Sequence, residues 1–293
     1  MLKGSKTERR RGDLFVLLAA VIWGVAFYFQ KTAMTHIGPL LFIGLRGSLA
    51  ALALLPLAFI EQKNSKQPLK DLIPIAFLGG AMFFIAGSIQ QYGLISATVT
   101  NTGFLTAIYV VFTPFFYWLI KRQRPTRVTW IAVVLAFVGV LGLSGGSLTG
   151  LSEGDFLVSL SSVFWALLLI TTGESSKWKR PLTYTCMQFA VVGLLGLVFA
   201  HVFETIEIQA IKQSVVSIVY VGLLSTAFTF ALMALALKHM PAPRASVLLS
   251  TETLFAAAAG YILLGERLSL IGWVGAILIL MAVLVLTKER SLS

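Results

Sequence analysis

The sequence predicts an all-α membrane protein of ten transmembrane helices, arranged as two inverted five-helix repeats around a central cavity. Hydrophobic residues make up 57% of the chain and charged residues only 12%, whereas a soluble domain carries about 25% charged residues. The chain also aligns with itself at a shift of 142 or 143 positions. Each copy holds five long apolar runs, and because five is odd, the second copy must start on the opposite side of the bilayer.

Matching residues in the two copies make the duplication visible. The shift aligns Gly12-Asp13 with Gly154-Asp155, Trp23 with Trp165, Pro39-Leu40 with Pro181-Leu182, Gly79 with Gly222, and Trp130 with Trp273. Tryptophan is rare in this chain, with 6 residues in 293, so two aligned pairs are unlikely by chance. An inverted repeat of this kind is typical of secondary transporters, which bind their substrate near mid-membrane between the halves.

The ten predicted helices follow the apolar runs, most of which are close to the ~20 residues that cross a bilayer. The runs are 14–34, 40–60, 72–92, 98–119, 128–146, 156–173, 182–203, 214–237, 245–264 and 270–287. The first run is too long for a signal peptide and lacks a cleavage site, so we interpret it as an uncleaved helix. Pro114 lies inside the fourth run and is expected to kink it.

Basic residues predict the orientation. Nineteen of the 23 lysines and arginines fall on the side of the N-terminus, three on the other side (Lys31, Lys212 and Arg267), and Arg46 lies within a run. This bias predicts that both termini are cytoplasmic. The predicted units are a cytoplasmic basic tail (1–12), the first repeat (13–146), a linker (147–153), the second repeat (154–288) and a cytoplasmic tail (289–293).

Other classes of function find little support. The net charge of +11 is explained by loops that orient the protein and contact anionic lipid, so no nucleic-acid partner is expected. Cys186 is the single cysteine, and the three histidines form no HxxxH pair, so we expect no metal site. The chain lacks a G-x-S-x-G elbow and a P-loop. We therefore expect no enzyme activity and no cofactor. The expected oligomeric state is a monomer or a weak dimer.

Several local patterns, in this order, resemble the EamA family of the drug/metabolite transporter superfamily. They are Leu18–Gly24 (LAAVIWG), Pro39 with Arg46 seven residues on, Tyr92–Ala97 (YGLISA), Pro241–Ser246 (PAPRAS), Gly265–Ser269 (GERLS) and Gly272–Gly275 (GWVG). Each motif alone is weak, but together they cover about residues 13–288. The second half departs from the duplicated pattern where Gln188 aligns with Arg46, so we expect the halves to contribute unequally to the site.

The resemblance implies a function. It implies two five-helix halves around a cavity and export of small metabolites by alternating access, with amino acids or their analogues as the expected cargo. YddG-type amino-acid exporters are the named relatives suggested within the family. Bacterial members act mostly in the inner membrane, which is the expected location. Import, exchange or uniport of another metabolite or drug remains an alternative, and so does lipid scrambling.

Two ionisable residues inside the predicted helices are the first site candidates, because a charge in hydrocarbon is costly. Arg46 could capture a substrate carboxylate, or it could be a structural cation that binds helix-end carbonyls or reaches the surface. Glu252 could be a proton site or the anchor of a substrate amine, or it could be a neutral or paired core carboxyl. Its counterpart in the first repeat is Tyr109, which we include in the site.

Polar and aromatic residues complete the predicted substrate site. Gln90, Gln91 and Asn101 lie near the outer ends of the third and fourth helices, where they could form a gate or bind substrate, or simply face solvent. Trp23, Phe27 and Gln30 share one helical face by their i, i+4, i+7 spacing. Together with Tyr28, Tyr109, Trp165 and Phe228, these three residues could form an aromatic wall of the cavity, unless they only pack the core.

The charge bias makes a direct prediction about topology. Reporter fusions at residue 293 should be active only in the cytoplasm, and fusions at residue 150 only outside, because positive loops stay on the cytoplasmic side. A C-terminus found outside would rule out the five-plus-five inversion.

Overall fold

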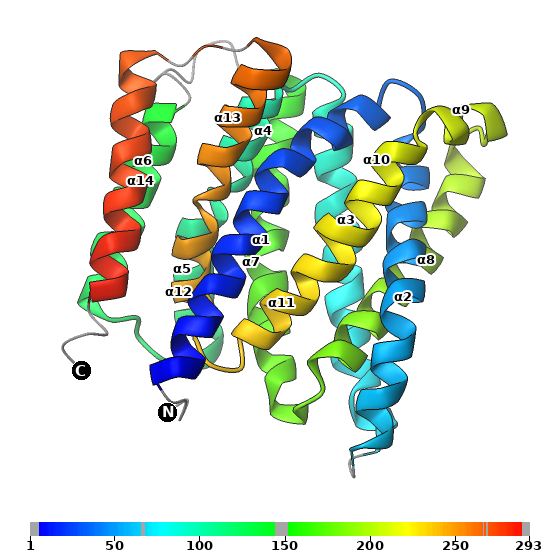
Figure 1. The fold of residues 1–293 in the computed structure, drawn as a ribbon, viewed down its shortest axis with the longest axis horizontal. Coiled ribbons are helices and arrows are strands. Elements are labelled where there is room, and N and C mark those ends of the chain that lie inside the picture. Colours follow the sequence, from blue (N-terminus) through cyan, green and yellow to red (C-terminus); the bar gives the residue numbers. More distant parts are fainter. Residues whose placement is uncertain (1–5, 66–67, 144–151, 266, 268, 289–293) are drawn as a thin grey trace.

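The computed structural model describes residues 6–65, 68–143, 152–265, 267, 269–288, and these are helical apart from short connections. The elements are α1 (Lys6–Ala33), α2 (Pro39–Lys63), η1 (Leu69–Asp71), α3 (Ile73–Leu94), α4 (Val99–Thr106), α5 (Tyr109–Lys121), α6 (Arg127–Leu143), α7 (Glu153–Ser175), η2 (Ser176–Trp178), α8 (Pro181–Phe203), α9 (Ile208–Gln213), α10 (Val215–Val219), η3 (Tyr220–Phe228), α11 (Thr229–Ala236), α12 (Ala242–Leu249), α13 (Glu252–Leu264) and α14 (Leu270–Lys288). They form one bundle of steeply inclined helices (Figure 1).

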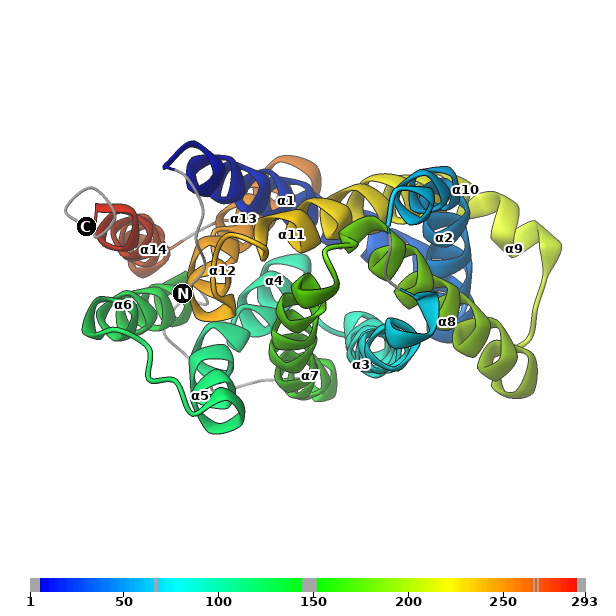
Figure 2. The same ribbon diagram turned by 90° about the horizontal axis from the view of Figure 1, so that it is seen from below.

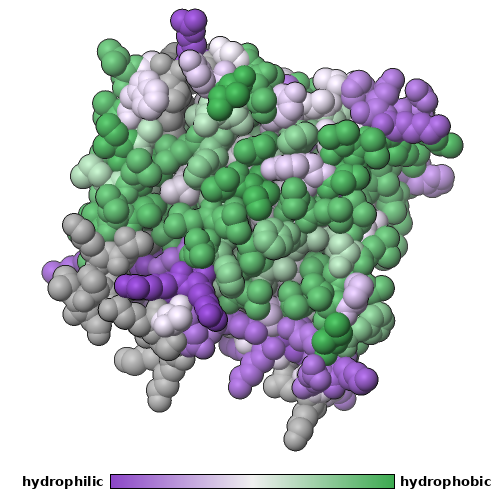
Figure 3. All heavy atoms as spheres, in the orientation of Figure 1, coloured by the Kyte–Doolittle hydropathy of each residue, from purple (hydrophilic) through white to green (hydrophobic). Residues whose placement is uncertain are grey.

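The bundle has the proportions of a multi-pass membrane protein. Within the described residues, eight helical stretches are long and apolar enough to cross a membrane, and two shorter apolar helices span Arg127–Gly142 and Leu270–Val285. Hydrophobic side chains form a broad band around the middle, and hydrophilic ones gather along the lower edge, where α1 begins (Figure 3). Such a band matches the hydrocarbon of a bilayer.

Helices occupy each of the ten predicted apolar runs, but three runs are not simple α-helices. The fourth run is divided into α4 and α5 at Ala107 and Ile108, and the ninth into α12 and α13 at Ser250 and Thr251. The eighth run contains η3, a π-helical segment between α10 and α11. The sequence predicted a kink at Pro114. The fourth helix is instead interrupted before this residue, and α5 continues through the proline.

The two divided helices have the same bounds when 143 is added to each residue number. Val99–Thr106 becomes Ala242–Leu249, and Tyr109–Lys121 becomes Glu252–Leu264. Both second segments also end in a left-handed residue, with φ of 54° at Arg122 and 70° at Gly265. The duplication seen in the sequence thus extends to the backbone.

The first helix of each repeat packs on helices of the other repeat. Helix α1 packs on α11, α12 and α13, and its counterpart α7 packs on α3, α4 and α5. Helices α2 and α8 pack on each other, as do α6 and α14. Figure 2 shows these two pairs at opposite ends of the bundle. In Figure 1, α1 starts at the lower edge and α7 at the upper edge, so the two counterparts run in opposite directions.

The α2·α8 pair is held by glycines and by reciprocal caps. A side chain on Gly44 would meet the backbone of Gly196 and Leu197, so the two helices approach closely. Glu204, just after α8, accepts hydrogen bonds from the first amides of α2, Leu40 N and Leu41 N, both at 2.8 Å.

The other end of the pair repeats this arrangement. Glu61, near the end of α2, accepts a hydrogen bond from Thr183 N at 2.7 Å and one from its hydroxyl at 2.9 Å. Residues 61 and 204 are themselves 143 positions apart. Each helix therefore supplies the carboxylate that satisfies the amides and the positive dipole at the start of the other.

We expect Gly44→Val to destabilise the protein by about 1–3 kcal/mol, because its side chain would force apart a tightly packed helix pair. Gly173→Ala is the matched control, since nothing lies within 4 Å of a Cβ built at this helical position. It should be neutral or stabilising by up to about 1 kcal/mol. Thermal unfolding of the detergent-solubilised variants measures both, and equal effects of the two substitutions would contradict the close approach.

Candidate functional site

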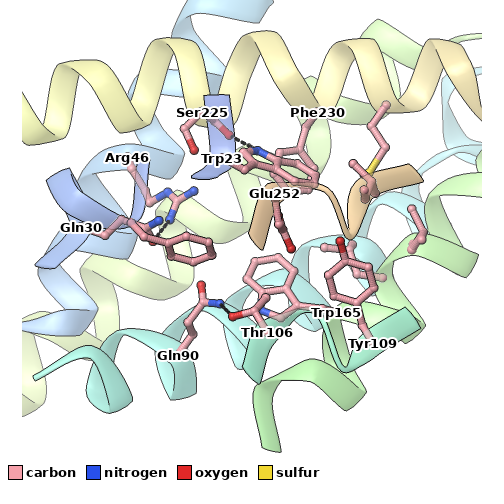
Figure 4. Close-up of a pocket in the computed structure, with 15 residues that line it drawn as sticks. Trp23, Gln30, Arg46, Gln90, Thr106, Tyr109, Trp165, Ser225, Phe230 and Glu252 are labelled. Atoms are coloured by element: carbon pink, nitrogen blue, oxygen red, sulfur yellow. Dashed lines mark hydrogen bonds between the residues drawn. The ribbon is translucent and has the colours of Figure 1, made fainter. Parts of the chain in front are cut away.

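A cavity lies between the halves and encloses about 560 Å³, including the part that opens to solvent. Its wall combines aromatic and apolar side chains with a few polar groups, as in most small-molecule sites. The lining residues are Trp23, Phe27, Gln30, Arg46, Gln90, Thr106, Tyr109, Trp165, Leu168, Leu169, Ser225, Phe230, Met233, Leu249 and Glu252. Figure 4 shows Arg46 and Gln30 on one side, Tyr109 on the other, and Trp23 and Glu252 between them.

The two helix interruptions place four of these side chains. At each break, i→i−3 hydrogen bonds replace the α-helical pattern, as in Ile108 N to Leu105 O at 3.4 Å and Thr251 N to Leu248 O at 3.3 Å. The tightened turn brings the last residue before the break and the first residue after it to the cavity: Thr106 and Tyr109 in one half, Leu249 and Glu252 in the other. Short 3₁₀ stretches within helices often mark functional hinges.

Arg46 is a buried cation bound only to neutral groups among the described residues. Its side chain is 3% exposed. The guanidinium donates from Nε to Thr226 Oγ1 at 2.9 Å and from Nη1 to Gln30 Oε1 at 3.1 Å, and it lies 5.3 Å from the centre of the Phe83 ring. These contacts orient the guanidinium without neutralising its charge. The group neither binds helix-end carbonyls in these contacts nor reaches the surface, which were the two structural roles suggested for Arg46 by the sequence.

Glu252 is the acidic group of the cavity. The residue is 2% exposed, and its Oε1 has no hydrogen-bond partner among the described residues. The Tyr109 hydroxyl is a neighbour of this carboxyl and likewise has no well-formed hydrogen bond within the described part of the chain. Neither Arg46 nor Glu252 takes part in an ion pair within the described part of the chain. The cavity thus holds one basic and one acidic side chain that are not paired with each other.

An aromatic cluster supports the cavity. Phe83 packs edge-on against three rings, with centroid distances of 5.1 Å to Trp165, 5.0 Å to Phe189 and 5.2 Å to Phe230. The Trp23 ring lies 5.0 Å from Phe230. Edge-to-face packing of this kind fixes ring positions beyond the effect of apolar burial alone. The cluster therefore gives the site a rigid apolar wall.

The two repeated tryptophans differ in their hydrogen bonding. Trp23 Nε1 donates to Ser225 O at 2.8 Å and to Thr229 Oγ1 at 2.7 Å. Ser225 belongs to the π-helical segment η3, and its carbonyl also accepts a hydrogen bond from Thr229 Oγ1 at 2.6 Å. Trp165 Nε1 is buried without a partner among the described residues. The positions that correspond to Ser225 and Thr229 in the first half are Met82 and Ala86, so the hydroxyl acceptor that Thr229 supplies to Trp23 has no counterpart at position 86.

The structure brings together six of the nine predicted site residues: Trp23, Arg46, Gln90, Tyr109, Trp165 and Glu252. Gln90 also donates to Thr106 Oγ1 at 2.7 Å, which links α3 to the end of α4. Gln188, the counterpart of Arg46, is buried but does not line the cavity. In that respect, the two halves do contribute unequally to it.

Three predicted site residues lie away from the cavity. Gln91 follows Gln90 on a helix and therefore points elsewhere, toward Met34, whose sulfur lies 3.7 Å from its Nε2. Tyr28 is half-buried and packs its ring edge-on against Phe29. Asn101 lies at the start of α4, where its Nδ2 donates to Asp155 Oδ1 at 3.2 Å. Phe228, a further aromatic candidate, is 44% exposed on the outside of the bundle.

Several lining residues were outside the predicted substrate-binding set. Phe27 and Gln30 were candidates for the cavity wall, because they share a helical face with Trp23, and both line the cavity. Thr106 and Leu249 are counterparts 143 positions apart, but they become recognisable only once the helix breaks are known. Leu168, Leu169, Ser225, Phe230 and Met233 carry no sequence signal that separates them from other apolar or small helical residues.

Comparison with known proteins identifies the family. The model of the EamA-like transporter family matches the chain twice, at residues 10–145 and 152–288. A protein of Archaeoglobus fulgidus described as an uncharacterized transporter is 30% identical over 96% of this chain and 87% of its own length. A probable amino-acid metabolite efflux pump of Salmonella typhimurium is 25% identical over 92% of this chain and 93% of its own.

Other comparisons agree in architecture. An uncharacterized inner membrane transporter of Salmonella typhimurium, YicL, is 25% identical over 96% of both chains. A solved crystal structure aligns with a TM-score of 0.77 over 96% of this chain and 98% of its own, at 13% identity, which shows a shared fold alone. The chain belongs to the EamA-like transporter family and is a multi-pass membrane transporter rather than an enzyme.

Proposed function

We propose that this protein exports small zwitterionic metabolites, with amino acids as the main class, through the cavity between its halves. The observation that carries this proposal is the presence of one buried cation, Arg46, and one buried carboxyl, Glu252, in a single apolar cavity without an ion pair between them. A zwitterion supplies both missing charges at once. Its carboxylate would bind Arg46 and its ammonium group Glu252, while its side chain would rest on the aromatic wall.

The energetic reason is the cost of burying charge. An isolated ion in a low-dielectric site is strongly unfavourable unless it is paired and hydrogen-bonded. Arg46 retains guanidinium donors beyond the two bonds that orient it, and a carboxylate fits this planar group well. Trp165 Nε1 and the Tyr109 hydroxyl add unsatisfied hydrogen-bonding groups beside the cargo. A neutral apolar molecule would leave all of these groups unsatisfied.

The mechanism we propose is alternating access between two inverted five-helix repeats, residues 13–146 and 154–288. The equal bounds of α4/α5 and α12/α13, the exchange of contacts between halves and the opposite directions of α1 and α7 support this arrangement. Two halves with the same fold and opposite orientation can exchange conformations, and the exchange opens the cavity to the other side of the membrane.

The location and direction that we propose are a cell inner membrane with both termini cytoplasmic, and outward transport. The distribution of basic residues supports the orientation. The Salmonella typhimurium relative described as an inner membrane transporter supports the location. The one described as a probable amino-acid metabolite efflux pump supports both the cargo and the direction.

Glu252 also offers a route to energy coupling. A carboxylate without a cationic neighbour is most stable in an apolar cavity when it binds either a proton or an ammonium group. Because one carboxylate holds only one of these at a time, cargo leaves on one side as a proton enters on the other. We therefore propose that Glu252 makes the transporter a cargo/proton antiporter.

Arg46→Ala should raise the KM for amino-acid transport by about 10- to 100-fold, which corresponds to the loss of one charge-assisted hydrogen-bonded contact of about 1.5–3 kcal/mol. Arg46→Lys should recover little of this loss, since lysine does not provide the planar pair of donors. Uptake of labelled amino acid into proteoliposomes measures the effect.

The matched comparison uses a decarboxylated amine of the same cargo. Its transport should be affected much less by Arg46→Ala, because it has no carboxylate to bind Arg46. If the variant loses thermal stability and transports amine and amino acid equally poorly, the guanidinium is structural and the proposed orientation of the cargo is wrong.

Glu252→Gln should abolish transport driven by a pH gradient while allowing exchange of labelled for unlabelled cargo, because exchange requires no net movement of protons. The amide keeps an oxygen acceptor for the ammonium group, so exchange should continue with reduced affinity. Proteoliposomes loaded with labelled cargo, with and without an imposed gradient, distinguish the two modes.

Wild-type flux that ignores the gradient, or a variant that still follows it, would remove Glu252 from the coupling mechanism. Facilitated diffusion would then be the better description. Transport of a different class of metabolite that is insensitive to both substitutions would refute the proposed cargo.

A further inference from the structure

Two polar contacts join the halves at opposite ends of the cavity-lining helices. At the face where α1 begins, Arg244 on α12 donates from Nη2 to Asp13 Oδ2 on α1 at 3.1 Å and from Nε to Oδ1 at 3.3 Å. At the face where α7 begins, Asn101 on α4 donates from Nδ2 to Asp155 Oδ1 on α7 at 3.2 Å. We call these the N-face latch (Asp13 and Arg244) and the opposite-face latch (Asp155 and Asn101).

The two latches are the same contact in the two repeats. Asp155 is the counterpart of Asp13 at a shift of 142, and Arg244 is the counterpart of Asn101 at a shift of 143. In both, an aspartate near the start of a helix binds the third residue of a divided helix, in α4 or in α12. Each contact joins one half of the chain to the other, so neither is an internal contact of a repeat.

A glycine precedes the aspartate in both latches, but the two glycines are not packed equally tightly. A side chain at Gly154, next to Asp155, would meet Gly93 at the end of α3 and Ser96 and Ala97 in the turn before α4. A side chain at Gly12, next to Asp13, would come within 3.0 Å only of the tip of the Met240 side chain, before α12. The close approach of helix and turn is therefore a feature of the opposite-face latch.

The latches differ in charge, and that difference is the basis of the inference. Arg244 and Asp13 form an ion pair with two hydrogen bonds, with side-chain exposures of only 6% and 16%. Asn101 offers a neutral amide to Asp155, which also accepts bonds from Ser152 N at 2.8 Å and Ser152 Oγ at 2.9 Å. A bidentate pair of opposite charges is stronger than a single bond from a neutral donor.

The surrounding contacts point the same way. Lys121 at the end of α5 pairs with Glu174 on α7 and adds a second ionic contact between the halves at the N-face. Lys31 binds the carbonyls of Leu94 and Ala97 near the opposite face, at 2.7 and 3.0 Å, but these residues all belong to the first half. The caps made by Glu61 and Glu204 are alike at both ends of α2·α8 and favour neither face.

We propose that the two latches are the gates of this transporter. Because the latch residue is Arg244 in one repeat and Asn101 in the other, the empty protein favours a closed N-face and an opening at the opposite face. The proposal rests on the alternating access proposed above but not on the identity of the cargo. Opening a face requires its latch to break, so the stronger latch keeps its face closed for more of the time.

A cysteine in the cavity can report this balance without any cargo. Met233→Cys in a Cys186→Ser background places one thiol in the cavity wall. A membrane-impermeant maleimide is added to sealed vesicles of each orientation. A protease-sensitive tag after residue 293 identifies the N-face, because α14 ends on the same side of the bundle as α1 begins. The ratio of labelling rates from the two faces is the measured quantity.

We expect labelling in the background variant to be faster from the opposite face than from the N-face. Arg244→Asn should shift the ratio of rates towards the N-face by about tenfold, which is about 1.4 kcal/mol. Asn101→Arg, which places a cation beside Asp155, should slow labelling from the opposite face. The double variant Asn101→Arg/Arg244→Asn exchanges the latches and should invert the preference.

Charge exchange separates gating from damage to the fold. Asp13→Arg/Arg244→Asp keeps an ion pair and should restore the ratio of the background variant, whereas Asp13→Arg alone should not. Ratios that stay unchanged in Arg244→Asn and in Asn101→Arg, with melting temperatures maintained, would overturn the proposal. So would equal changes at both faces. Because no cargo is present, failure of the amino-acid hypothesis would leave these outcomes readable.

Discussion

The hydrocarbon interior of a membrane supplies no hydrogen-bond partners, so each polar group of this protein between the two membrane faces must be satisfied by the protein itself or by its cargo. Several groups follow this rule within the chain: Glu61 and Glu204 bind the first amides of α8 and α2, and Trp23 binds the Ser225 carbonyl. Arg46 and Glu252 are different, because they lie in one cavity and neither takes part in an ion pair in the described part of the chain. The proposed cargo would supply the two missing partners.

The sequence was sufficient to predict an all-helical, multi-pass membrane protein because that information is distributed over many residues. Apolar runs of membrane length, repeated tryptophans and the distribution of basic residues each average over long stretches, and helices occupy all ten predicted runs. Arg46 and Glu252 were recognisable because a charge in hydrocarbon is rarely neutral in its consequences. Six of the predicted site residues meet in the cavity. Two of them were found by this charge argument, and the others by polarity, helical spacing or the internal repeat.

The remaining details depend on local backbone geometry. Gln90 and Gln91 are equally polar, and only the rotation of α3 decides which of them faces the cavity. The breaks at 107–108 and 250–251 carry neither proline nor glycine, so no turn signal marks them, whereas Pro114, which does carry such a signal, lies within a continuous helix. Asn101 was predicted from its polarity and its place near a helix end to form a gate or bind substrate, and it lies outside the cavity, where it binds an aspartate of the other half.

The reciprocal caps of α2 and α8 have a consequence for how the protein meets its lipid environment. Because Glu204 holds the start of α2 and Glu61 holds the start of α8, neither helix can slide along the other without losing a charged contact at one end. The pair therefore has a fixed hydrophobic length. In a thinner bilayer, the two helices would therefore tilt together as one body.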